Sequence, residues 1–206
     1  MEEKNIQFYS ETGLDKYIRQ NYYLDYSYKG IMVEVGGGMP NTISNSKHFR
    51  DNGWRTIVFE PNPELHKLFS ENNIECYNIA CSNEDKENVD FSVCNNNSGL
   101  SFSSLKVRYS SFHAESMPLT NIKVNTIRLD TFFNHKNIQK IDFMTIDVEG
   151  WELEVIEGFD PNKVNCKYII LENFEQNQSY EQKMLKIGYQ KIHDLHYDQI
   201  YQKIKK

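Results

Sequence analysis

Two short stretches of the chain combine glycine and glutamate in a way that suits a nucleotide cofactor. An apolar strand predicted over residues 30–35 runs into the triplet Gly36 to Gly38. Glycines lack Cβ, so they let the backbone turn sharply and approach a ligand closely. A second apolar strand, predicted over residues 54–59, ends at Glu60, whose carboxylate can accept hydrogen bonds from both hydroxyls of a ribose. We therefore expect a nucleotide site at these two strand ends.

The spacing of the glycines distinguishes between two kinds of nucleotide. A dinucleotide-binding loop has glycine at its first, third and sixth positions, and counted from Gly36 the sixth position here is Asn41. Glu34 precedes the glycines at the end of an apolar strand, where a buried charge is costly unless it meets a donor or a cation. The ammonium and sulfonium groups of S-adenosylmethionine suit this acid better than a pyrophosphate does. S-adenosylmethionine is the predicted cofactor, although a strand, turn and helix with unrelated glycines would show the same local pattern.

A second group of acids follows two other apolar strands. The strand predicted over residues 141–146 is followed by Asp147 and Glu149, and the strand predicted over residues 166–171 ends in Glu172. The carboxyl ends of parallel strands meet at one edge of a sheet, and ligands bind beyond that edge. We therefore expect these acids to face the same cleft as the glycines.

The placement of both groups depends on an alternation of strands and helices along the chain. Such an alternation favours a parallel sheet that is covered by helices on both faces. The prediction is an α/β fold with a seven-stranded, mostly parallel sheet and a C-terminal antiparallel hairpin. The predicted strands span residues 30–35, 54–59, 74–80, 141–146, 166–171, 189–195 and 199–203, and the predicted helices span residues 41–52, 63–72 and 179–187.

The first part of the chain lies outside this alternation. Residues 11–23 have mixed helical spacing and could form a helix over the sheet or over the mouth of the cofactor site. We expect residues 1–29 to form a helical lid or cap, followed by the main domain over residues 30–206.

The middle of the chain is less regular than the rest. A polar stretch from about residue 95 to residue 118 separates a short strand at 89–93 from a strand at 124–129, which leads into a short helix at Asp130 or Thr131. A loop of this length is usually a lid, a binding loop or disordered. Three small residues in it belong either to a loop that closes over the ligands or to an ordinary surface loop: Ser98, Gly99 and Ser101.

The composition excludes some classes of partner. The chain of 206 residues has 23 basic and 29 acidic residues and a net charge of −6, which argues against a nucleic-acid partner because such proteins usually present a basic face. No apolar run is long enough to span a membrane. No signal peptide and no metal-ligand spacing accompany the four cysteines, so we expect reduced thiols in the cytoplasm: Cys76, Cys81, Cys94 and Cys166.

Five motifs in succession resemble those of the FkbM family of S-adenosylmethionine-dependent methyltransferases. The resemblance covers about residues 30 to 195 and implies a Rossmann-like class I methyltransferase fold. It also implies methylation of a hydroxyl oxygen, on sugars or on polyketide natural products. The motifs are Val33-Glu34-Val35-Gly36-Gly37-Gly38, Val58-Phe59-Glu60-Pro61-Asn62-Pro63, Asn78-Ile79-Ala80-Cys81-Ser82, Ile127-Arg128-Leu129-Asp130 and Ile146-Asp147-Val148-Glu149-Gly150-Trp151-Glu152.

The resemblance also implies roles for individual residues. In it, Asp147 and Glu149 match an acidic strand end near the methyl group. Two departures from the family pattern are the run of three glycines and Cys81 in place of a leucine-like residue, and neither removes a hydrogen-bond donor. The implied cofactor contacts are Glu34, Gly36 and Gly38 with the methionyl part, Glu60 with the ribose, and Ala80, Cys81 and Ser82 beside the adenine.

Methyl transfer to an alcohol requires alignment of the reactants and a group that removes the hydroxyl proton. Our candidate base is Asp147, with Glu149 orienting it or the acceptor. A metal is the competing device, because Asp147, Glu149 and Glu172 could also ligate Mg²⁺. Glu149 could instead merely place negative charge at a helix N-terminus.

Other residues with suitable chemistry have ordinary structural explanations. Trp151 is expected in the core, with lining of the acceptor pocket as the alternative. His113 in the long loop and His193 near a strand end are alternative bases. The remaining histidines are expected to be solvated: His48, His66, His135 and His196.

The predicted function is S-adenosylmethionine-dependent O-methylation of a small molecule, with a sugar of a surface polysaccharide or of its precursor as the acceptor. A natural-product acceptor and a catalytically weak cofactor-binding module are the alternatives. Nucleic acid or protein as the acceptor has no support, because the sequence shows no basic groove. The sequence does not identify the acceptor oxygen or the oligomeric state.

Overall fold

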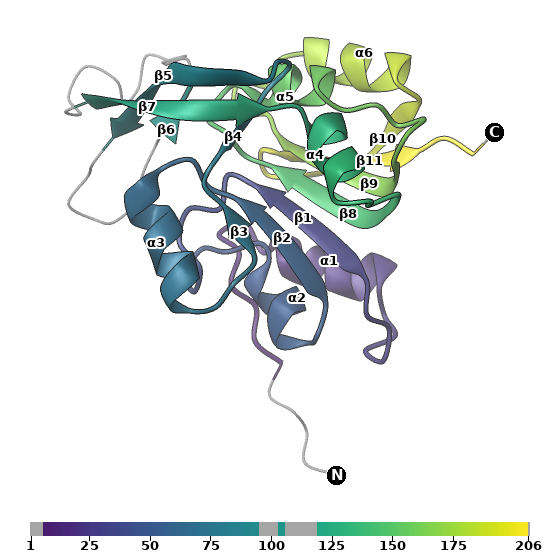
Figure 1. Cartoon of the computed structure of the whole chain (residues 1–206). Helices are drawn as coiled ribbons and strands as arrows, with labels where there is room; N and C mark the ends of the chain where they lie inside the picture. Colours follow the sequence, from purple (N-terminus) through teal and green to yellow (C-terminus); the bar gives the residue numbers. More distant parts are fainter. Residues whose placement is uncertain (1–5, 95–102, 106–118, 206) are drawn as a thin grey trace.

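A large and a small β-sheet form the framework of the computed structural model (Figure 1), which describes residues 6–94, 103–105 and 119–205. The large sheet has seven strands in the order β10-β11-β9-β8-β1-β2-β3. Its strands are β1 (Ile31–Val35), β2 (Arg55–Phe59), β3 (Cys76–Tyr77), β8 (Lys140–Ile146), β9 (Asn165–Glu172), β10 (Tyr189–Leu195) and β11 (Asp198–Lys203).

Parallel pairing in the centre of the large sheet aligns the carboxyl ends of its strands. β1 lies between β2 and β8 and pairs with both in parallel, and β3 and β9 continue the parallel arrangement outward. β11 and β10 are antiparallel to their neighbours. The register sets Val35 opposite both Phe59 and Ile146, so the residues that follow these three strands lie at one edge. The predicted α/β class with a large, mostly parallel sheet is confirmed.

Helices cover both faces of the large sheet (Figure 1). Side chains alternate between the two faces along each strand, so Met32 of β1 packs with α1 and α2, whereas Val33 packs with α4, α5 and α6. We call the two clusters the α1–α2 core and the α4–α6 core. The helices are α1 (Leu14–Tyr22), α2 (Lys47–Asp51), α3 (Pro63–Glu71), α4 (Leu129–His135), α5 (Glu152–Glu157) and α6 (Ser179–Lys186).

Local sequence explains where α3 and α2 begin. α3 starts with Pro63 at its first position, and the side chain of Asn62 accepts a hydrogen bond from the backbone N–H of Glu64 (3.0 Å), as expected of an N-cap residue. The helix predicted from residue 41 begins only at Lys47. The intervening residues 41–46 are rich in Asn and Ser, which bond to nearby backbone and so favour turns over helix.

The small sheet corrects the predicted path of the middle of the chain. The strand predicted over residues 74–80 is interrupted: β3 stays in the large sheet, and the chain then crosses to the small one. The predicted strands at 89–93 and 124–129 also belong to the small sheet, whose order is β4-β7-β5-β6. Its strands are β4 (Ala80–Cys81), β5 (Lys86–Cys94), β6 (Ser103–Ser104) and β7 (Leu119–Ile127).

The small sheet has an apolar core of its own. Ala80, Phe91, Val93 and Val124 are buried together in it. The strand at Ser103–Ser104 lies within the stretch that was predicted to be entirely loop, whereas Ser98, Gly99, Ser101 and His113 lie outside the described residues. The chain therefore contains a second sheet layer that the alternation of strands and helices did not predict.

Helix α1 packs against the large sheet. Leu14 and Ile18 are buried in the α1–α2 core beside Met32 and Phe143, so α1 shares a core with the sheet. Among the helices of the described residues, none has both the length and the apolar character needed to cross a bilayer. The three cysteines whose side chains are described are free.

Candidate functional site

The large sheet has a natural binding edge at the carboxyl end of β1. The chain places β2 and β3 on one side of β1 and β8 and β9 on the other, so the strand order reverses between β1 and β8. In open α/β sheets, ligands bind beyond the carboxyl ends of the strands at such a reversal. Gly36, Glu60 and Asp147 directly follow β1, β2 and β8 there.

The three glycines after β1 have different reasons to be glycine. A Cβ on Gly36 would lie 1.8 Å from the carbonyl oxygen of Asp147, and a Cβ on Gly37 would lie 2.5 Å from the side chain of Val58. A Cβ on Gly38 would meet nothing within 4 Å. Close packing of the protein therefore requires the first two glycines, and Gly38 is the one whose backbone faces open space.

Glu60 joins the glycine loop to the end of β2. Its Oε2 accepts a hydrogen bond from the backbone N–H of Gly38 (2.8 Å), and its Oε1 accepts one from the backbone N–H of Asn62 (2.8 Å). The side chain is only 4% exposed, and burial raises the pKa of Glu60 to about 7 against the opposing effect of the two amides. Each oxygen keeps a second lone pair, so the carboxylate can still accept bonds from hydroxyl groups.

Glu34 is buried with part of its hydrogen-bonding capacity unused. Its Oε1 accepts from the backbone N–H of Asn45 (2.8 Å), whereas its Oε2 has no hydrogen-bond partner of acceptable geometry in the described chain. Burial raises the pKa of Glu34 to about 7, although hydrogen bonds from Ser46 and Asn45 and the charge of Arg50 oppose the rise. The cross-strand neighbour Thr145 also has a buried hydroxyl without a partner. A donor or a cation would satisfy this pair of polar groups.

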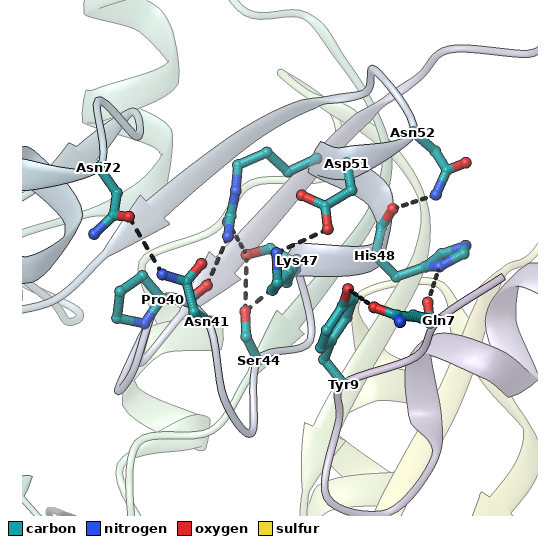
Figure 2. A network of polar contacts seen from close by, with 12 residues as sticks. Gln7, Tyr9, Pro40, Asn41, Ser44, Lys47, His48, Asp51, Asn52 and Asn72 are labelled. Atoms are coloured by element: carbon teal, nitrogen blue, oxygen red, sulfur yellow. Dashed lines mark hydrogen bonds and ion pairs between the residues drawn. The ribbon is translucent and has the colours of Figure 1, made fainter. Parts of the chain in front are cut away.

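Polar contacts hold the loop between β1 and α2 in place (Figure 2). The Nδ2 of Asn41 donates to the Oδ1 of Asn72 just after α3 (3.3 Å), and Ser44 Oγ accepts from the first backbone N–H of α2 (3.2 Å). The guanidinium of Arg50 donates to the carbonyl of Pro40 (2.6 Å). The loop that follows the glycines is therefore anchored to α2 and to the end of α3.

The three residues that the resemblance places beside the adenine have their side chains largely engaged by the protein. Ala80 is buried in the core of the small sheet and Cys81 in the α4–α6 core. Ser82 Oγ accepts a hydrogen bond from Nε1 of Trp151 (3.1 Å). Trp151 itself is half-buried and packs against the α4–α6 core, in agreement with its expected structural role.

Three carboxylates meet at the ends of β8 and β9. One oxygen each of Asp147, Glu152 and Glu172 lies within 4.8 Å of the others. Glu149, which the sequence grouped with Asp147 and Glu172, is not a member of this trio. Glu152 takes its place because α5 directs it back toward the end of β8.

Within this trio, Glu152 has a structural role. Its Oε1 accepts from the backbone N–H groups of Val148 and Gly150 (both 3.0 Å), and its Oε2 accepts from the hydroxyl of Tyr180 (2.6 Å). These donors satisfy both oxygens of a carboxyl group that is buried. Glu152 thereby fixes the turn that carries Glu149 and holds Asp147 at the sheet edge.

Asp147 and Glu172 form a hydrogen-bonded pair of carboxyl groups. Burial raises the pKa of both groups, and neighbouring acids add to the effect. The hydrogen bond between them lowers the pKa of Asp147 and raises that of Glu172, as expected when a protonated Glu172 donates to an ionised Asp147. Asp147 is therefore the member of the pair that can accept a proton.

Glu149 occupies a strained position beside this pair. Its backbone has φ 59, a conformation that is uncommon for residues other than glycine. Burial, followed by the charges of Asp147 and Glu152, raises the pKa of its carboxyl group. Helix α5 begins only at Glu152, and it is Glu152 rather than Glu149 that binds the backbone amides of the turn before that helix.

The segment before α1 reaches the same edge of the sheet. Thr12 Oγ1 donates to Oδ2 of Asp198 at the start of β11 (2.6 Å), and Asp198 lies opposite Glu172 in the sheet. Neither Thr12 nor Asp198 was singled out from the sequence, since no local pattern indicates that residues 186 positions apart will meet. Glu152 did carry a signal, because an acid in the first turn of a helix often binds backbone amides.

Two histidines depart from their prediction, since His48 is buried and His66 is half-buried. His48 was expected to be solvated but is 1% exposed. Its Nδ1 donates to the carbonyl of Gln7 (2.7 Å; Figure 2), and Phe8 stacks on its ring with the centroids 4.4 Å apart. The prediction was wrong because the segment before α1 covers α2, and helical spacing within α2 carries no information about that segment.

The other described histidines lie as follows. His135 and His196 are exposed, as expected, and His66 is half-buried. His193, an alternative base, stacks on the ring of Tyr17 of α1 with the planes 4° apart. Aromatic packing of His193 against α1 explains its position without a catalytic role.

Comparison with known proteins gives one family match. Residues 33–199 match the sequence model of the Methyltransferase FkbM domain. Among solved structures, the chain is similar to a precorrin-6y C5,15-methyltransferase from Geobacter metallireducens GS-15, with 12% sequence identity and a TM-score of 0.43 over 85% of this chain and 82% of that chain. A search of curated proteins finds no match.

Proposed function

The chain belongs to the FkbM methyltransferase family, and on that premise we propose that it transfers a methyl group from S-adenosylmethionine to a hydroxyl oxygen of a small molecule. The observation that carries the proposal is the meeting of two groups of acids at the reversal of strand order. We call Glu34 and Glu60 the cofactor-side acids, and Asp147, Glu149 and Glu172 the acceptor-side acids. The backbones of the two sides touch where Gly36 packs on the carbonyl of Asp147.

The cofactor-side residues fit S-adenosylmethionine. Glu34 has a buried oxygen without a partner, which suits the ammonium group. Glu60 keeps lone pairs for the ribose hydroxyls, and the open side of Gly38 leaves its backbone accessible. When bound, S-adenosylmethionine supplies a methyl group that is activated by the positive charge of its sulfonium. Ala80, Cys81 and Ser82 are the proposed neighbours of the adenine.

The acceptor-side residues suit the removal of a hydroxyl proton. An ionised carboxylate within hydrogen-bonding reach is an adequate base for an alcohol that becomes more acidic as its oxygen is alkylated. Asp147 is the proposed base, since its hydrogen bond with Glu172 keeps the proton of the pair on Glu172. Glu149 and Glu172 remain to orient the acceptor through its other polar groups.

A carbohydrate is the proposed acceptor, as part of a surface polysaccharide or of its precursor. Sugars present several hydroxyls at the edge of a ring, and a group of carboxylates can accept hydrogen bonds from them. A natural-product alcohol is the alternative acceptor. A cofactor-binding module with weak catalysis is the alternative from another class, and the retained acids Asp147, Glu149 and Glu172 argue against it.

A divalent cation is a second candidate for activation of the acceptor. The oxygens of Asp147, Glu152 and Glu172 approach one another closely, and Mg²⁺ is commonly held by one or two carboxylates together with water and substrate. Glu152 already accepts three hydrogen bonds, so the available ligands are Asp147 and Glu172. Full activity after exhaustive chelation would exclude this candidate, whereas loss of activity that Mg²⁺ restores would favour it.

Residues 1–29 are proposed to act as a cap on the acceptor side. The contact between Thr12 and Asp198 brings the segment before α1 beside the acceptor-side acids. Free thiols in the described cysteines suit a reducing compartment. We accordingly propose that the reaction takes place in the cytoplasm.

Isothermal titration with S-adenosylmethionine and with NAD tests the proposal. We expect micromolar binding of S-adenosylmethionine, roughly 8 kcal/mol of binding free energy, and no measurable binding of NAD. Tight binding of NAD without binding of S-adenosylmethionine would contradict the proposed function. A protein heated until unfolded and then cooled on ice serves as the control for non-specific heat effects.

A further inference from the structure

Two aromatic rings flank the acceptor-side acids. Phe174 follows Glu172 by two residues at the end of β9, and Tyr197 lies in the turn between β10 and β11, directly before Asp198. The ring centroids of Phe174 and Tyr197 are 5.8 Å apart and the planes are tilted by 53°. Asp198 lies opposite Glu172 in the sheet, so the segments that carry the two rings leave the sheet at the same edge as these carboxylates.

Phe174 is exposed to an unusual degree for its residue type. Its side chain is 62% accessible, and it is the one phenylalanine among the large exposed hydrophobic residues of the described chain. Exposure of a phenyl ring to water does not stabilise the fold, although single exposed apolar residues occur on many proteins. Its position beside a group of carboxylates makes a ligand contact the better explanation here.

Hydrogen bonds of Asn173 hold the start of the loop that carries Phe174. Asn173 is 3% exposed, and its backbone N–H donates to the carbonyl of Tyr197 (2.8 Å). The side chain of Asn173 donates to the carbonyl of Asn177 and to Oε1 of Gln199 (both 3.0 Å) and accepts from the backbone N–H of Asn177 (2.8 Å). Because the backbone beside both rings is already held by these hydrogen bonds, less conformational entropy would be lost when a ligand binds.

Tyr197 lies within electrostatic reach of the acids. Burial, followed by the charges of Glu11, Glu172, Asp198 and Asp147, raises the pKa of its hydroxyl to about 12. Its hydroxyl therefore stays protonated at neutral pH and can donate a hydrogen bond. The half-buried side chain of Tyr197 therefore offers both an apolar ring and a hydroxyl donor near the acceptor-side acids.

We propose that Phe174 and Tyr197 form an aromatic corner that binds the face of the acceptor's ring and so selects a pyranose. A pyranose has C–H groups on its faces and hydroxyls at its edge. The faces suit an aromatic ring, whose negative face attracts polarised C–H groups. The hydroxyls at the edge suit the adjacent carboxylates, and one of them would be directed toward Asp147. This inference rests on the proposed function and specifies its acceptor.

Ligand-observed NMR tests the aromatic corner. Saturation-transfer difference spectra would be recorded with methyl glycosides of common hexoses and 6-deoxyhexoses, in the presence of S-adenosylhomocysteine. We expect at least one glycoside to bind through the protons of one ring face. Phe174→Ala and Tyr197→Ala should each raise its dissociation constant about three- to tenfold, whereas Tyr197→Phe should keep most of the affinity because it keeps the ring.

A matched control separates the corner from exposed apolar surface in general. Leu185 on α6 is 60% exposed, so Leu185→Ala removes a similar apolar area and should leave glycoside binding unchanged. Unchanged binding to Phe174→Ala would overturn the inference. So would the absence of any glycoside binding to a protein that binds S-adenosylhomocysteine, which would leave methyl transfer to another class of hydroxyl intact. Failure to bind S-adenosylhomocysteine would overturn both proposals together.

Discussion

The cofactor-side and acceptor-side acids lie at the same edge of the large sheet, yet they have different hydrogen-bond partners. Backbone amides meet Glu60 on both oxygens and Glu34 on one. Asp147 and Glu172 instead bond to each other, and burial raises the pKa of both. Acids held by fixed amides are suited to receive the donors and cations of a ligand, whereas a carboxyl pair with raised pKa values is suited to accept a proton. The difference supports the proposed division, in which one side binds the cofactor and the other accepts the proton.

The largest effect is expected at the backbone contact that joins the two sides. Gly36→Ala would put a Cβ 1.8 Å from the carbonyl oxygen of Asp147, at φ 88. Backbone atoms cannot yield at low cost, so we expect a loss of more than about 4 kcal/mol in the free energy of unfolding. Gly38→Ala meets open space and should cost only about 1 kcal/mol, for its left-handed backbone. Urea unfolding of both variants measures this, and equal losses would refute the assigned contact.

Asp147→Asn should separate catalysis from binding. Loss of the base should reduce turnover by about a hundredfold or more, because the amide cannot accept the hydroxyl proton. The dissociation constant of S-adenosylmethionine should change less than about threefold. Turnover equal to that of the original protein would remove Asp147 from the mechanism.

Glu60→Ala should have the opposite pattern. It removes the charged acceptor proposed for the ribose, and we expect the dissociation constant of S-adenosylmethionine to rise at least about tenfold. Glu75→Ala is the matched control, since Glu75 forms its ion pair with Arg55 on the surface (2.9 Å). Calorimetric titration of both variants measures this, and an unchanged constant in Glu60→Ala would contradict the role of Glu60.

The pH dependence of cofactor binding should follow the cofactor-side acids. Burial raises the pKa of Glu60 to about 7 in the free protein, so the group is mostly ionised at pH 8 and mostly protonated at pH 6. A protonated carboxyl group is the weaker acceptor, so affinity for S-adenosylmethionine should fall as the pH falls. The expected change between pH 8 and pH 6 is roughly tenfold. Titrations at several pH values measure this change. An affinity that does not vary with pH would contradict a contact between ionised Glu60 and the cofactor.

Tyr180→Phe should have the smallest effect. The change removes the hydroxyl that donates to Glu152 (2.6 Å), at a cost of about 1 kcal/mol in the free energy of unfolding. Because Glu152 acts on the acceptor side only through the turn after β8, turnover should fall modestly and cofactor affinity should not change. Thermal unfolding and initial rates measure the two effects. A large loss of cofactor affinity would show that the two sides are not separate.

The sequence predicted the central strands of the large sheet well and the middle of the chain poorly. β1, β2, β8 and β9 lie within a residue or two of their predicted bounds because their apolar runs are buried on both faces. The small sheet was missed because its strands pair across long stretches of chain, and local patterns carry no record of distant partners. The interruption between Tyr77 and Ala80 has the same cause.

The residues of the site show the same limit. Glu34, Glu60 and Asp147 were identified because acids at the ends of apolar strands stand out in the sequence. Glu152 was not, because its role depends on the direction of α5 and on the hydroxyl of Tyr180. Gly36 was attributed to the cofactor, whereas the structure shows that the carbonyl of Asp147 also requires it. Contacts between strands that are far apart in sequence decide such cases.

A crystal structure with S-adenosylhomocysteine bound tests the central claim most directly. The claim predicts electron density for the amino-acid part of the ligand beside Gly38, with its amino group near Glu34 and the ribose hydroxyls on the carboxylate of Glu60. Density that shows the edge between Gly38 and Glu60 filled by protein side chains, or the ligand bound elsewhere, would contradict it.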